Sequence, residues 1–283
     1  MKRKAPCPLS LLAPLALVAA CEPLPLDETA PPFEGAAEVP DCRPDNDGVI
    51  ERPELPFVAG VIARYRVAEG PVAVEPAGRL DDTGTRVWDL SVPKPDAEPL
   101  ARLAAERMEG HWFEPSFPGV ELAGPLDARA SLLGPLSVDD EGVHLHGAAS
   151  KEPQPEEGET LLVYDEPITL YPFPLAEGAH VVTEGRATNG TLLGLPVALL
   201  DRYDVEVTAR GTLRLPDLIL ENTLRVTLRL ERTLVVGDAR QVTHVFVHEC
   251  LGEVARMTSE AVPLDEPLDD DFDTAAQVWR LSL

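Results

Sequence analysis

The chain has 283 residues, a formal net charge of −25 and 44% hydrophobic residues. This hydrophobic content excludes wholesale disorder, and the strongly acidic surface argues against binding to nucleic acid, whose phosphates it would repel. A content of 29 prolines with only 5% aromatic residues is typical of strands and turns rather than of a helical bundle.

The first 21 residues have the pattern of an export signal. A basic run at residues 2–4 precedes the apolar segment Leu9–Ala20, which ends in small residues and is too short to span a bilayer of ~30 Å as a helix. The sequence LVAAC at residues 17–21 resembles the lipobox of bacterial lipoproteins. The resemblance implies a signal peptide at 1–20 and fatty acylation of Cys21, for example with palmitate. It also implies a lipid anchor in the cell envelope, which we expect to be in the outer membrane. Ordinary secretion with Cys21 as an incidental thiol is the alternative.

The composition changes sharply after the signal. Residues 22–40 contain five prolines and five acidic residues, so we predict a disordered tether at 21–40. A short turn-rich segment follows at 41–56, and a β-rich globular domain is expected at 57–283. Removing residues 1–20, which carry three basic and no acidic side chains, would take the net charge from −25 to −28.

Two cysteines remain after the signal and the lipid site are set aside. Cys42 and Cys250 would lie in an oxidising compartment, where a disulfide between them is expected. A reactive or metal-bound thiol, or two unpaired thiols, are the alternatives that the sequence leaves open.

Alternation of apolar and polar residues predicts most of the globular part as strands. The pattern is longest at 203–215 and 223–236, where it predicts antiparallel strands with one buried and one solvated face. Arg232 is the exception on the apolar face of the second run. Gly237 and Asp238 predict a tight turn that pairs this strand with 241–249 in a hairpin. Further strands are expected at 61–67, 85–90, 143–148, 159–170, 251–258 and 275–283.

One helix is predicted at Pro95–Glu109, where Leu100, Leu103 and Met108 have helical spacing and Gly110 follows as a stop signal. The expected fold class is therefore α+β and β-dominated, with a large curved antiparallel sheet that resembles half a barrel and carries one or two helices.

Residues 45–54 resemble part of an EF-hand calcium loop. With Gly48 at the sixth position of that loop, Asp45, Asp47 and Glu54 fall at the third, fifth and twelfth positions, where calcium takes carboxylate ligands. Arg43 stands at the first position, where the motif has a carboxylate. The resemblance implies calcium as the one candidate cofactor, and a plain turn beside Cys42 is the alternative.

Four histidines form a second candidate metal site. His144 and His146 share one strand face, and His244 and His248 share another. If the two strands were neighbours, four imidazoles could bind zinc or copper. Partly exposed or hydrogen-bonded histidines with no common role are the alternative.

No catalytic residues are assigned, because the chain has no nucleophile elbow, phosphate-binding loop, dinucleotide fingerprint or metalloprotease helix. The segments LYPFPL at 170–175 and ECLGEVAR at 249–256 resemble parts of uncharacterised envelope lipoproteins of Gram-negative bacteria, which implies an architecture and no activity. We therefore favour a non-enzymatic lipoprotein that binds an apolar ligand on its curved sheet or serves as a scaffold for envelope proteins. A calcium-dependent binding or adhesion module and an envelope hydrolase with an unrecognised site are the alternatives.

Overall fold

The computed structural model describes residues 33–34, 42–92, 99–235 and 237–283. The signal, Cys21 and all but two residues of the predicted tether lie outside the described residues. Strands dominate the fold, and the helical elements described are two short 3-10 helices, η1 (Arg52–Glu54) and η2 (Glu114–Ser116). Within the described residues, no helix has the length and apolar character needed to cross a membrane.

All described strands except β2 and β12 belong to one large sheet, and those two pair with each other. The strands are β1 (Phe33–Glu34), β2 (Val49–Ile50), β3 (Ile62–Ala73), β4 (Arg79–Leu80), β5 (Arg86–Asp89), β6 (Leu100–Leu103), β7 (Glu106–Arg107), β8 (Leu122–Pro125), β9 (Leu132–Val138), β10 (Gly142–Ser150), β11 (Leu161–Pro172), β12 (Leu175–Ala176), β13 (His180–Leu192), β14 (Leu195–Arg214), β15 (Ile219–Leu234), β16 (Ala239–His248), β17 (Gly252–Ser259), β18 (Val262–Pro263) and β19 (Thr274–Leu281).

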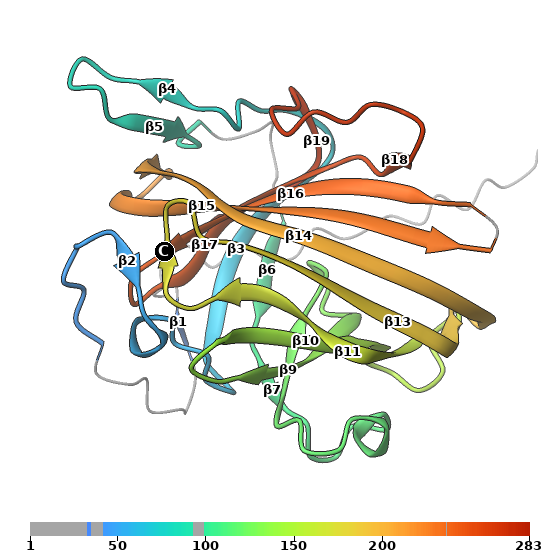
Figure 1. Ribbon diagram of the computed structural model, residues 1–283. Coiled ribbons are helices and arrows are strands. Elements are labelled where there is room, and N and C mark those ends of the chain that lie inside the picture. The colour runs from blue at the N-terminus through green and yellow to red at the C-terminus, as the bar shows by residue number, and fades with distance from the viewer. Residues whose placement is uncertain (1–32, 35–41, 93–98, 236) are drawn as a thin grey trace, which may run out of the picture.

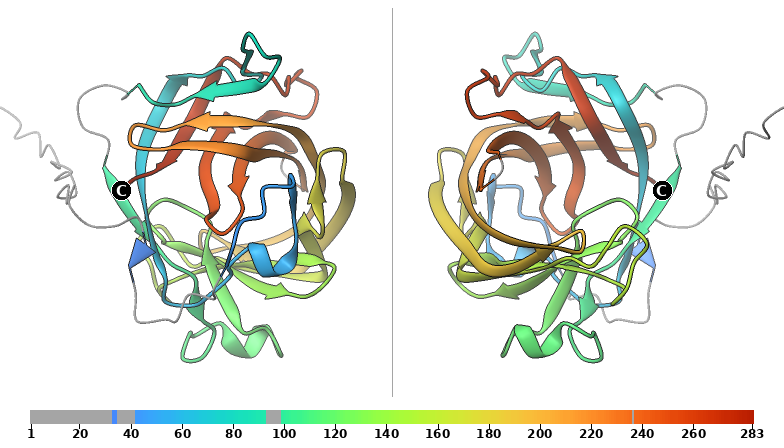
Figure 2. Two further views of the ribbon diagram at one scale, coloured as in Figure 1. Left: turned by 90° about the vertical axis from the view of Figure 1, so that its left-hand side faces the viewer. Right: turned by 90° about the vertical axis from the view of Figure 1, so that its right-hand side faces the viewer.

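The main sheet is antiparallel and strongly curved. Its pairings run from β8 through β9, β10, β11, β13, β14, β15, β16, β17, β19 and β3 to β6, and Figure 2 shows these strands wrapping around a common axis. The sheet is not closed into a barrel, since among the described strands no pairing joins β6 to β8 or β9. Among the strands that the structure describes, only β5 pairs in parallel, with the end of β14. The predicted fold class, a β-dominated protein with a large curved antiparallel sheet, is confirmed.

The two long alternating segments form the neighbouring strands β14 and β15, and the predicted hairpin between β15 and β16 is confirmed. The prediction that one face of β15 is solvated is wrong for part of the strand. Thr223 and Thr227 are fully buried on that face, because a loop at 268–273 and the segment before β4 cover it. Polar residues in a strand indicate which face of the sheet is outward, but a segment from elsewhere in the chain can still cover that face.

The helix predicted at Pro95–Glu109 is wrong. Its described residues form β6 and β7, and β6 pairs with β3, whereas 93–98 lie outside the described residues. Leu100, Ala101 and Leu103 are all buried, so this segment is apolar on both faces. The helical spacing of its leucines is therefore coincidental, and the free edge of β3 determines that a strand forms there.

The core lies on both sides of the sheet. Inside the curve, Val205, Leu224 and Val245 belong to one large buried cluster. On the outside, Trp88 of β5 packs edge-to-face on Phe246 of β16 at 5.1 Å, within a second cluster. Figure 1 shows the β4–β5 hairpin lying over this part of the sheet. A smaller cluster lies around η2, between residues 108 and 149.

A disulfide ties the N-terminal segment to the sheet. Cys42 and Cys250 are bonded, with their Cα atoms 5.5 Å apart, so the predicted pairing is confirmed. The segment after Cys42 is held further by the pairing of β2 with β12. Within the stretch predicted to be a disordered tether, Phe33–Glu34 forms β1 and pairs with β3.

Candidate functional site

The concave face of the sheet encloses a cavity of about 510 Å³, which falls within the range of roughly 300–1,000 Å³ typical of small-molecule sites. A further hollow of about 200 Å³ shares four lining residues with it, so the two adjoin. Leu193, in the turn between β13 and β14, lines the cavity and is 57% exposed, so the cavity reaches the surface at this turn. Its apolar walls include Leu145 of β10, Leu162 and Leu170 of β11, Leu228 and Leu230 of β15 and Val245 of β16.

A buried ion pair stands at the wall of this cavity. Asp201 of β14 lies directly across from Arg232 of β15, and both oxygens of its carboxylate accept hydrogen bonds at 2.7 Å from Nε and Nη2 of the guanidinium. The Asp201 side chain is 0% exposed, and it also accepts a hydrogen bond of 2.5 Å from the hydroxyl of Tyr164. Arg232, the charged residue that interrupts the apolar alternation, is thus the partner of a buried carboxylate.

A second pair lies farther along the same interior. Nε and Nη2 of Arg256 donate to the two oxygens of Glu253 at 2.8 and 2.7 Å, and the guanidinium lies over the ring of Trp279 at 4.5 Å. The hydroxyl of Tyr65 donates to the backbone oxygen of Glu253 at 2.7 Å. Tyr171 lines both hollows beside this pair. The cavity is therefore apolar along its walls and polar at two fixed points.

The tyrosines of the interior are neutral at physiological pH. Burial raises the pKa of Tyr203 to about 12, with the charge of Asp201 adding to the effect. Burial likewise raises the pKa of Tyr164 and Tyr171 well above the usual range. For Arg232, burial alone would lower the pKa, but the hydrogen bonds and charge of Asp201 outweigh it and raise the pKa. Each guanidinium balances one carboxylate, so the interior carries no net charge from these groups.

Arg232 retains hydrogen-bonding capacity toward a ligand. Asp201 occupies its Nε and Nη2, and among the described residues no hydrogen bond joins its Nη1 to the protein. The side chain is 28% exposed and lines the cavity. An acceptor or anionic group of a ligand could therefore bind here while its apolar part contacts the leucines.

The residues that line the cavity are the ones that would have to supply the catalytic groups of a hydrolase acting there. Histidine, lysine and cysteine, the usual partners that activate a nucleophile, do not occur among the described residues that line the cavity. Ser131 at the rim donates to Asp127, which also accepts backbone N–H groups of its own loop. That hydrogen-bonding pattern is typical of a turn.

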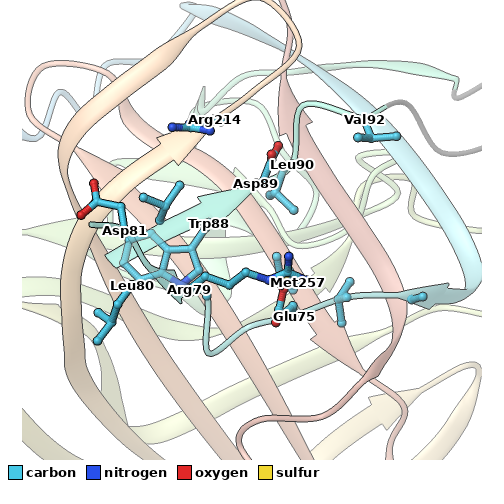
Figure 3. A pocket seen from close by; sticks show the side chains of 14 residues that line it. Glu75, Arg79, Leu80, Asp81, Trp88, Asp89, Leu90, Val92, Arg214 and Met257 are labelled. Carbon is cyan, nitrogen blue, oxygen red and sulfur yellow. Dashed lines mark hydrogen bonds and ion pairs between the residues drawn. The ribbon is translucent and has the colours of Figure 1, made fainter. Parts of the chain in front are cut away.

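A separate hollow of about 550 Å³ lies beside the β4–β5 hairpin (Figure 3). Its lining includes Arg79, which pairs with Glu75 at 2.8 Å on the surface, and Trp88, whose indole N–H is bonded to a backbone oxygen. Leu80 and Val92 at its edge are exposed. Because its Arg79–Glu75 pair is exposed to solvent, we assign this hollow no role.

The predicted calcium ligands are only partly brought together. Asp45 and Glu54 lie close to each other, and the third member of the cluster is Glu249, a residue that the sequence comparison with an EF-hand could not reveal. Asp47 is not in the cluster. Its carboxylate accepts the N–H of Val49 at 2.7 Å and caps the turn instead.

The four histidines do not form a common site. His144 and His146 are on β10, whose partners are β9 and β11, whereas His244 and His248 are on β16, whose partners are β15, β17 and β18. Each has its own hydrogen-bond partner; Nε2 of His244, for example, donates to the Asp270 oxygen at 2.7 Å. The predicted zinc or copper site is therefore wrong, because four strands separate β10 from β16 in the sheet.

The sequence contains one clue to the interior site. Arg232 was recognised as a charge on an apolar face, but Asp201 has the same parity as Tyr203 and Val205 and was not singled out. Two opposite charges on apolar strand faces predict a cross-strand pair once the register is known. The register of β14 with β15 was not part of the prediction, so the pair was missed.

The chain was compared with models of protein families, with curated proteins and with solved structures, and nothing matches in any of the three.

Proposed function

We propose that this protein is a lipid-anchored cell-envelope protein, held at Cys21 and located in the outer membrane, that binds an apolar, lipid-like ligand inside its curved sheet. The observation that supports ligand binding most directly is the cavity of about 510 Å³ on the concave face. The support for the anchor is the signal pattern and lipobox-like sequence at residues 1–21.

The chemistry of the lining favours an amphipathic ligand over a purely apolar one. Leucine side chains would contact an acyl chain, and Nη1 of Arg232 would donate to a carboxylate, ester or phosphate oxygen. The exposed Leu193 at the mouth would ease passage of the chain from a membrane into the cavity.

Binding is tested with cis-parinaric acid, a fluorescent fatty acid, titrated into the folded domain with its disulfide intact. The wild-type protein should give saturable fluorescence. Thr243→Trp, on the inner face of β16, should fill the cavity and lower the affinity about tenfold or more, equivalent to about 1.4 kcal/mol. Val182→Trp is the matched control, since Val182 is exposed on β13 and does not line the cavity. Equal affinity in all three proteins, or no saturation, would refute the proposal.

The anchor is tested separately by metabolic labelling with an alkyne analogue of palmitate in a Gram-negative host. The full chain should be labelled and should fractionate with outer membranes, and Cys21→Ser should lose both properties. Labelling that persists in Cys21→Ser would exclude this lipid site while leaving the ligand-binding proposal to its own test.

A further inference from the structure

Three carboxylates meet where the N-terminal segment joins the sheet. One oxygen atom from each of Asp45, Glu54 and Glu249 lies within 4.8 Å of the other two. Glu249 adjoins Cys250, whose disulfide to Cys42 brings the segment at 45–54 to this place. The N–H of Cys250 also donates to the backbone oxygen of Glu54 at 2.7 Å. The disulfide and this hydrogen bond together hold the segment that carries Asp45 and Glu54 beside Glu249.

Each carboxylate is oriented by a backbone N–H group that binds only one of its oxygens. Oδ1 of Asp45 accepts from Asp47 at 3.0 Å, Oε2 of Glu54 accepts from Glu51 at 2.9 Å, and Oε2 of Glu249 accepts from Asn46 at 2.9 Å. This arrangement fixes the carboxylates in place, and it leaves a second oxygen on each of them.

Glu249 supplies an independent indication that this cluster binds a ligand. Its side chain is only 2% exposed, and its Oε1 atom is buried without a hydrogen-bond partner in the described part of the chain. A buried oxygen without a partner is costly, and more so when it is charged and lies beside two other carboxylates.

We propose that Asp45, Glu54 and Glu249 bind a hard divalent cation, with calcium preferred over magnesium. The donors are all oxygens, and the two nearby cysteines are oxidised to a disulfide, so a thiolate-loving metal such as zinc is not favoured. Two oxygens that each bind one calcium ion at roughly 2.4 Å can stand no more than about 4.8 Å apart, and the oxygens of this cluster lie within that limit. Magnesium requires shorter bonds of about 2.0–2.1 Å and a nearly octahedral shell. The exposed Asp45 leaves the outer side open for water ligands.

The site differs from an EF-hand in how it is built. Its ligands come from two segments about 200 residues apart that a disulfide of sequence separation 208 unites, and η1 rather than a long helix carries Glu54. The cation would neutralise the repulsion among the three carboxylates and hold residues 42–54 against the turn after β16. The site is independent of the cavity and of its ligand.

Isothermal titration calorimetry on the oxidised domain, freed of metal with EDTA and then dialysed, tests the proposal. Calcium should bind at one site with a dissociation constant of roughly 0.1–1 mM, the range of extracellular calcium modules, and should raise the melting temperature. Magnesium should bind more weakly. Glu54→Gln and Glu249→Gln should each weaken calcium binding about tenfold or more, because each removes one of three charged ligands.

Two features separate a binding role from a structural one. In EDTA, Glu249→Gln should melt no lower than the wild-type protein, because the amide removes a buried negative charge from the cluster. Asp47→Asn is the matched control and should keep the wild-type affinity, since Asp47 caps the turn outside the cluster. If Glu249→Gln fails to fold, the half-buried Glu54 alone decides the test.

Absence of calcium-dependent heat and of any melting shift in the wild-type protein up to about 10 mM would overturn the proposal. Unchanged affinity in Glu54→Gln would overturn it equally. Loss of binding in Asp47→Asn with retention in Glu249→Gln would return the site to the EF-hand alignment and refute the cluster.

Discussion

The buried pair between Asp201 and Arg232 allows a quantitative test of how the interior is stabilised. The two side chains lie directly across from each other on β14 and β15 and make two hydrogen bonds of 2.7 Å. We consider Asp201→Leu, Arg232→Met and the double variant D201L/R232M. The substitutions remove the charges while retaining apolar bulk.

The magnitude follows from the burial of each partner. Breaking a buried ion pair by removing one side costs about 3–5 kcal/mol, whereas replacing both sides with apolar groups is often close to neutral. Asp201 is 0% exposed and Arg232 is 28% exposed, so Arg232→Met leaves the more deeply buried of the two charges, that of Asp201, without its partner. We expect Arg232→Met to cost about 4 kcal/mol and Asp201→Leu about 2–3 kcal/mol. The double variant should cost about 1–2 kcal/mol, less than Asp201→Leu, because Tyr164 loses its acceptor in both variants but the double variant leaves no charge unpaired.

The free energy of unfolding is measured by urea denaturation with tryptophan fluorescence, under conditions that keep the disulfide oxidised. The adjacent cross-strand pair, Arg202 with Glu231, is a matched control. It occupies the same two strands one register position away, but its atoms are 3.6 Å apart and both side chains are exposed. A double-mutant cycle on Arg202 and Glu231 should give a coupling energy below about 1 kcal/mol.

Additive effects of Asp201→Leu and Arg232→Met would refute this account of the interior. So would a coupling energy no larger than that of the exposed pair. A change in the denaturant slope would show instead that the denatured state differs among the variants.

Three further results are expected. Burial lowers the pKa of His244 to about 4, so the unfolded chain takes up a proton at a higher pH than the folded protein does. Between pH 6.5 and 4, the wild-type protein should therefore lose about 3 kcal/mol of stability relative to the His244→Asn variant. A difference in stability between the two proteins that stays constant over this pH range would contradict this. Reducing the bond between Cys42 and Cys250 should lower the free energy of unfolding by up to about 5 kcal/mol in the chain-entropy model, and a melting temperature insensitive to reductant would exclude that contribution. A Cβ at Gly147 would overlap the backbone oxygen of Leu162, so Gly147→Ala should cost about 3 kcal/mol in urea unfolding. A cost under about 1 kcal/mol would show that β10 can shift.

Much of the strand content could be predicted because period-two alternation is a local property. The segments at 203–215 and 223–236 each contain enough alternating residues to indicate a strand without reference to any partner. The segment at 180–192 forms β13 and was not predicted, since its small and polar residues do not give a clear apolar face. At Pro95–Glu109, helical spacing was misleading because the segment is buried on both sides.

The candidate sites show the same division. The disulfide could be predicted from the number of cysteines and the expected compartment, without knowledge of the fold. Asp45 and Glu54 could be proposed as ligands from their spacing in one short segment, but Glu249 could not, because it lies about 200 residues away in the chain. Similarly, Asp201 gains its meaning only from the register that places it opposite Arg232.

The sequence by itself determined the long alternating strands β14 and β15, the turn between β15 and β16 and the candidate pair of cysteines, since each depends on residues that are close in the chain or on their number. Only the tertiary structure decided the curvature of the sheet, the cavity on its concave face, the burial of both faces of β15 and the meeting of three carboxylates. These features depend on which strands become neighbours and in which register. Alternation specifies that a strand has two faces, but pairing and packing energies between distant segments select what each face contacts.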